Sequence, residues 1–131
     1  MAELYALTAN RVFTEDDGIT NTVAFRDDAQ GADAYLLVQL AHEFSQEDLE
    51  LGMNTVYLEL GDEMRATYGG LTAIEVAPTS ILFRLDSESA ADLKVDGGIK
   101  IALDVEGPKL AEALERLAAI AADARVPIKP Q

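Results

Sequence analysis

The feature that most restricts the fold is a change in hydrophobic period near the C-terminus. Up to residue 105, apolar residues come in short segments that often alternate with polar residues and are separated by turn residues, which is typical of strands. The segment 99–105 is the clearest of these. From Gly107-Pro108 onward the spacing becomes helical, with Pro at an early position where its missing N–H does no harm. The apolar stripe of this helix comprises Leu110, Leu114, Leu117, Ile120 and Ala121.

The turns between the predicted strands are short, which favours antiparallel neighbours because a parallel pair needs a long crossover. Residues 71–77 and 80–85 should form a hairpin around Pro78-Thr79. A helix with one apolar stripe must place that stripe on a sheet face. We therefore expect an α+β fold with a mostly antiparallel sheet of about six or seven strands and a C-terminal amphipathic helix packed on it.

The remaining segments are assigned to strands and short helices one by one. Residues 3–14 should form a first strand, and residues 35–40 form a central strand covered on both faces or a buried helical segment. Ser45 with Asp48 resembles a short helix start, and residues 86–93 favour a second short helix. The chain, 1–131, is interpreted as a single domain, with 125–131 as an extended tail.

Composition restricts the function. The chain has no cysteine, which excludes disulfides, thiolate zinc sites and a cysteine nucleophile. Its formal net charge of −14 argues against nucleic acid and anionic membranes as partners, because both would be repelled. No signal peptide and no apolar run of about 18 residues is visible, so a cytoplasmic protein is expected.

The negative charge lies mainly in the first half. Residues 1–63 carry a net charge of −12, and residues 64–131 carry −2. Such asymmetry suggests an acidic face and a basic partner if the first half is contiguous in space. A solubilising surface or a halophilic host would also produce it.

No catalytic motif stands out. His42 is the single histidine, and it is interpreted as a structural or surface residue because zinc and facial-triad sites usually need more than one imidazole. The glycine pairs occur in turns, and no phosphate-binding loop follows them. The acidic clusters lack calcium-loop spacing. Composition leaves a two-carboxylate hydrolase open, although the chain has no tryptophan to hold a sugar. We expect no enzyme activity, metal or cofactor.

Acidic clusters and an accompanying tyrosine remain as a candidate contact surface. Tyr57 should point away from the core, and Tyr68 follows an acidic pair, so each could act as an amphipathic anchor within a charged rim or as a partly buried core residue. The candidate partner-binding residues are Glu15, Asp16, Asp17, Glu47, Asp48, Glu50, Asp62, Glu63 and Tyr68.

Several segments, in order, resemble the immunity protein 10 family of bacterial polymorphic toxin systems. They are Tyr35-Leu36-Leu37-Val38-Gln39, Leu51-Gly52-Met53, Val56-Tyr57-Leu58-Glu59, Tyr68-Gly69-Gly70-Leu71 and Leu82-Phe83-Arg84-Leu85. With the strand from Ile99 and the closing helix, the resemblance spans roughly Phe25 to Ile120, leaving residues 1–24 outside it.

The resemblance implies a small bacterial cytoplasmic protein that binds a cognate toxin and neutralises it by stoichiometric inhibition; no catalytic residues come with the family. Two alternatives stay open. One is a small-ligand carrier or enzyme with a pocket between sheet and helix, where Glu59, Glu75 or His42 would point inward. The other is a subunit of a larger assembly. Exposed edge strands also leave a homodimer open.

Overall fold

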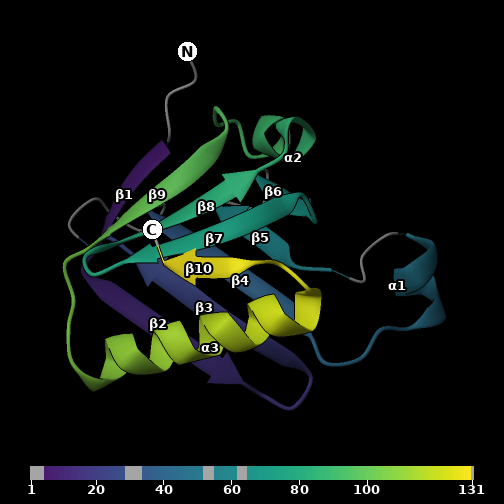
Figure 1. Cartoon of the computed structure of the whole chain (residues 1–131). Helices are drawn as coiled ribbons and strands as arrows, with labels where there is room; N and C mark the ends of the chain where they lie inside the picture. The colour runs from purple at the N-terminus through teal and green to yellow at the C-terminus, as the bar shows by residue number, and fades with distance from the viewer. Residues whose placement is uncertain (1–4, 29–33, 52–54, 62–64, 131) are drawn as a thin grey trace.

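Two five-stranded sheets face each other in the computed structural model, and a long helix lies along one side of them (Figure 1). The structure describes residues 5–28, 34–51, 55–61 and 65–130. The strands are β1 (Tyr5–Ala9), β2 (Arg11–Asp16), β3 (Thr20–Arg26), β4 (Tyr35–Ala41), β5 (Tyr57–Leu60), β6 (Ala66–Tyr68), β7 (Leu71–Ala77), β8 (Ser80–Leu85), β9 (Gly98–Leu103) and β10 (Ile128–Pro130). The helices are α1 (Gln46–Glu50), α2 (Ser87–Asp92) and α3 (Pro108–Ala124).

The α+β class is confirmed, but the strand arrangement differs from the expectation of one sheet with about six or seven strands. One sheet has the order β2-β3-β4-β5-β6 and is antiparallel throughout. The other has the order β1-β9-β8-β7-β10, with β1 parallel to β9 and β10 parallel to β7. Below, these are called the meander sheet and the mixed sheet.

Three local features account for the difference in strand number, and one of them is the short strand β6, which was not expected. The predicted first strand, 3–14, is divided at Asn10, so that β1 joins the mixed sheet and β2 the meander sheet. At the other end, the expected tail contributes β10, whose Ile128 is in register with Ile74 of β7. The Pro78-Thr79 hairpin is confirmed, since Ala77 pairs with Ser80.

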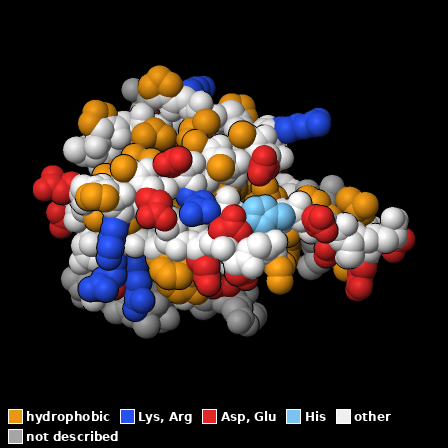
Figure 2. All heavy atoms as spheres, turned by 90° about the horizontal axis from the view of Figure 1, so that it is seen from below, with side chains coloured by type: hydrophobic (Ala, Val, Ile, Leu, Met, Phe, Trp, Pro, Cys, Tyr) orange, Lys and Arg blue, Asp and Glu red, His pale blue; other side chains and the backbone are white. Residues whose placement is uncertain are grey.

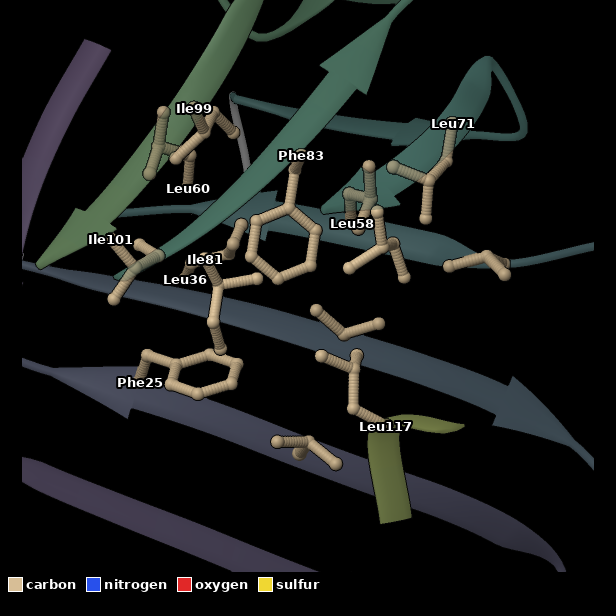
Figure 3. Close-up of a cluster of buried hydrophobic side chains, with 14 of the residues drawn as sticks. Phe25, Leu36, Leu58, Leu60, Leu71, Ile81, Phe83, Ile99, Ile101 and Leu117 are labelled. Atoms are coloured by element: carbon tan, nitrogen blue, oxygen red, sulfur yellow. The ribbon is translucent and has the colours of Figure 1, made fainter. Parts of the chain in front are cut away.

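The core lies between the two sheets (Figure 3). Phe25 of the meander sheet meets Phe83 of the mixed sheet edge-to-face, with ring centroids 6.1 Å apart. Leu36, Leu58, Ile81 and other fully buried aliphatic side chains surround them. Residues 35–41 form the strand β4, so the alternative of a buried helical segment was wrong. β4 alternates buried with half-buried residues, so the prediction that both of its faces are covered was also wrong: only one face is fully covered. The other face of the meander sheet points away from the core.

The predicted C-terminal helix and its packing on a sheet face are confirmed. α3 begins at Pro108 and ends before Arg125, which adopts a left-handed conformation. Ala113, Leu117 and Ile120 are buried, and α3 packs against β2, β3, β4 and β10. Of the predicted apolar stripe, Leu117, Ile120 and Ala121 are buried, whereas Leu110 and Leu114 are half-buried.

The Gly69-Gly70 pair forms the corner at which the chain leaves β6 of the meander sheet and enters β7 of the mixed sheet. Both glycines have positive φ, 79° and 78°. A Cβ on Gly70 would lie 1.7 Å from the Ser89 hydroxyl of α2. This corner therefore requires glycine for its backbone conformation and for the close approach of α2.

Candidate functional site

The β2–β3 turn and α1 bring two of the predicted acidic segments to one end of the molecule. The His42 imidazole at the end of β4 bonds Asp16, with 2.7 Å between Nε2 and Oδ1, and the His42 backbone N–H donates to the carbonyl of Ile19. α1 follows four residues later and projects from the sheets (Figure 1). Figure 2 shows acidic side chains beside the histidine and along this projection. We call Glu15, Asp16, Asp17, Glu47, Asp48 and Glu50 the acidic end.

Asp16 and Asp17 also stabilise the turn that carries them. Asp17 accepts hydrogen bonds from the backbone N–H groups of Thr20 and Ile19, at 2.8 and 2.9 Å, and these lower its pKa. The bond with His42 and the N–H of Gly18 lower the pKa of Asp16. Asp16 also lies 3.6 Å from the Arg116 guanidinium of α3. Both carboxylates therefore serve the β2–β3 turn, and their part in binding stays a prediction.

The carboxylates of α1 have fewer internal partners. Ser45 and Asp48 form the capping box that the sequence predicted, with Asp48 N–H donating to Ser45 Oγ and Ser45 N–H donating to Asp48. Glu47 and Glu50 are exposed. Within the described ranges, no basic side chain forms an ion pair with Glu47, Asp48 or Glu50. The charge of α1 is thus available to a partner.

The tyrosines occupy the outer face of the meander sheet, as predicted for Tyr57. Tyr57 pairs with Tyr68 across β5 and β6, with ring centroids 5.0 Å apart and the rings tilted by 50°. Tyr57 donates to Glu59 at 2.6 Å, and Tyr35 donates to the other oxygen of the same carboxylate. Tyr68 is exposed, at 43% of its surface. Of the predicted contact residues, Asp62 and Glu63 lie outside the described residues.

A hollow of about 120 Å³ joins the tyrosines to the acidic end. We call it the tyrosine hollow. Its lining comes from β3, β4, α1, β5, β6 and the segments beside them, namely Thr20, Gln39, Ala41, Phe44, Asp48, Thr55, Tyr57 and Tyr68. The structure therefore brings together Asp48 and Tyr68, two predicted contact residues separated by 20 positions in the sequence.

Sequence reasoning missed the exposed apolar residues among these acids. Ile19 of the β2–β3 turn is 71% exposed, and Leu49 and Leu51 of the α1 segment are 49% and 62% exposed. A signal existed for the leucines, because a five-residue helix surrounded by acids offers them no apolar neighbour to bury against. Apolar anchors within a charged rim are the usual composition of a protein interface.

The alternative of an enzyme with a pocket between sheet and helix required Glu59, Glu75 or His42 to point inward, and the structure places these side chains differently. His42 is exposed and bonds Asp16, while Glu59 lies on the outer face of the meander sheet. Glu75 is buried but ion-paired with Arg84, whose hydrogen bond lowers the pKa of the Glu75 carboxyl. A wider groove of about 790 Å³ reaches from β2 to the start of α3, and none of these three side chains lines it.

No group of three or more metal-ligating His, Asp or Glu side chains occurs in the part of the chain that the structure describes. No described helix is long and apolar enough to cross a membrane.

Comparison with known families decides the assignment. The family model for immunity protein 10 matches residues 8–111. The chain belongs to the immunity protein 10 family. The match begins in β1 and includes all of β2, so the expectation that residues 1–24 lie outside the resemblance was wrong for most of that segment. It ends in the first turn of α3, short of the predicted limit near Ile120.

The immunity protein 10 family name implies an immunity protein directed against a toxin and suggests a non-enzymatic role. A search of curated proteins and a search of solved structures each gave no match.

Proposed function

We propose that this immunity protein 10 family member neutralises a cognate bacterial toxin in the cytoplasm of the producing cell by forming a stoichiometric complex with it. The observation that carries the proposal is the family match over residues 8–111. The protein acts without turnover, by occupying the toxin's active site or a surface next to it.

The acidic end is the proposed contact surface. Within the described residues the α1 carboxylates are not ion-paired, and Leu49 and Leu51 are exposed in the same segment. Ile19 is exposed in the β2–β3 turn, where its N–H bonds Asp17. Buried apolar anchors provide affinity, whereas the surrounding charge raises the association rate with a basic partner. A toxin with a basic surface, such as one that binds nucleic acid, has the complementary charge.

Titration of toxin activity tests the mode of action. The probe is the toxin recovered by pull-down with this protein from its native host, with its activity measured against increasing immunity protein. Stoichiometric inhibition predicts that activity falls linearly to zero at one equivalent and that a complex of the summed mass elutes from size exclusion. Loss of all activity at a small fraction of one equivalent would instead indicate an enzyme that modifies the toxin.

A further inference from the structure

We propose that the tyrosine hollow receives one lysine or arginine side chain of the toxin. The inference rests on the proposed function and identifies a specific contact within the acidic end. In this proposal the aromatic rings of Tyr57 and Tyr68 contact the cationic head group, and the Asp48 carboxylate pairs with it as the opposite charge.

The size of the hollow favours a single side chain. Pockets for small-molecule ligands usually measure about 300–1,000 Å³, whereas this hollow measures about 120 Å³. That space suits the head group of one long side chain. Strand residues of the meander sheet and Asp48 of α1 both line it, so an entering side chain can contact both elements.

The lining suits a cation. Tyr57, Tyr68 and Phe44 contribute aromatic rings, and the face of an aromatic ring attracts Lys and Arg through its quadrupole. The Tyr57 hydroxyl donates to Glu59 at 2.6 Å, which pushes electron density toward the Tyr57 ring and strengthens that attraction. Of the residues that line the hollow, Asp48 alone carries a formal charge, and that charge is negative.

Asp48 is held ready for this contact. Its Oδ2 accepts from the Ser45 N–H at 2.9 Å, while its own N–H donates to Ser45 Oγ at 3.0 Å. The capping box fixes the side chain before the partner arrives, so binding loses little rotamer freedom. Among the described residues, no lysine or arginine forms an ion pair with this carboxylate.

Double-mutant cycles with an inactivated form of the toxin recovered by pull-down test the contact. Tyr68→Ala and Asp48→Asn should each weaken the affinity at least tenfold, and asparagine retains the oxygen that caps α1. Phe13→Ala is the matched control, because Phe13 is an exposed aromatic outside the hollow, and it should change the affinity less than twofold. One toxin lysine or arginine should lose its effect on affinity in the Tyr68→Ala background. Additive effects for every basic toxin residue, or wild-type affinity for both variants, would overturn the proposal.

A second measurement separates this inference from the proposed function. Nuclear magnetic resonance titration with acetyl-arginine amide should shift resonances of Tyr57, Tyr68 and Asp48, whereas the neutral acetyl-citrulline amide should not. If the toxin domain does not bind the wild-type protein, the proposed function fails, but localised arginine shifts would retain the hollow as a cation site. Shifts that are absent or spread over the surface would remove the hollow as a cation site.

Discussion

Gly70 of the sheet-to-sheet corner and Ser89 of α2 are packed so closely that no side chain fits between them. A Cβ on Gly70 would lie 1.7 Å from Ser89 Oγ and 2.4 Å from Ser89 Cβ. The Ser89 hydroxyl also donates to the carbonyl of Gly69 at 3.2 Å. The Tyr68-Gly69-Gly70 motif, which contributed to the family resemblance, therefore has a structural requirement at its second glycine.

Gly70→Ala should destabilise the fold by about 2–4 kcal/mol, since overpacking typically costs about 1–3 kcal/mol and alanine at positive φ adds roughly 1 kcal/mol. Gly18→Ala is the matched control, because Gly18 has φ 85° and a Cβ added there would meet nothing within 4 Å. It should cost only the backbone component, roughly 1 kcal/mol. Urea denaturation measures both, and equal losses would contradict the steric account.

The Phe25–Phe83 contact links the two sheets, so we propose that they unfold together as one domain. Phe83→Ala should cost about 3–5 kcal/mol and shift every spectroscopic probe together. Phe25→Leu and Phe83→Leu should show a coupling energy of about 0.5–1.5 kcal/mol in a double-mutant cycle. The two effects are coupled because either substitution alone already removes the edge-to-face contact. Two separate unfolding transitions in the wild-type protein would contradict the single-domain proposal.

Asp17 should make stability depend on pH in the acid range. The N–H groups of Thr20 and Ile19 lower its pKa below the ordinary value of 3.8. The unfolded chain therefore binds more protons than the native protein in this range, so the contribution is complete above the ordinary pKa and is lost as pH falls through the native pKa. The melting-temperature difference between wild type and Asp17→Asn should be largest near neutral pH and shrink in acid. A difference that stays constant down to about pH 2 would contradict this account.

Reversing charge on α1 should slow association with the toxin. Glu47→Lys combined with Glu50→Lys removes unpaired negative charge from the proposed contact surface and should lower the association rate constant about tenfold at low salt. The control pair, Glu106→Lys with Glu115→Lys, makes the same change in net charge away from α1, since Glu115 lies in α3 and Glu106 just before it. It should lower the association rate constant less. Stopped-flow or biolayer measurements at several salt concentrations report both pairs. An association rate that does not change with salt would rule out electrostatic steering.

Local sequence signals were sufficient for several elements. Pro108 and the stripe ending at Ala121 predicted α3, Pro78-Thr79 predicted the β7–β8 hairpin, and Ser45 with Asp48 predicted the start of α1. Each of these depends on residues close together in the chain, where capping, turn geometry and hydrophobic period act directly.

The candidate surface was predicted in part. The sequence predicted Tyr68 and the α1 acids as contact residues, which stays a prediction, and the structure places Tyr68 and Asp48 in one hollow. The sequence alone could not show that Tyr57 and Tyr68 face each other, because their pairing depends on the β5–β6 register. Nor could it show that Asp16 pairs with Arg116, since 100 residues separate two side chains that meet only when α3 packs on the sheet.

The sequence by itself determined the α+β class, the closing helix and the family of this protein, because periodicity and short motifs are properties of neighbouring residues. Tertiary structure alone decided that there are two sheets and that β1 pairs with β9. Tyr5 lies in register with Ile99, and no local rule selects a partner at that separation. The choice comes from burying Phe25 and Phe83 in a common core, which is a property of the whole chain.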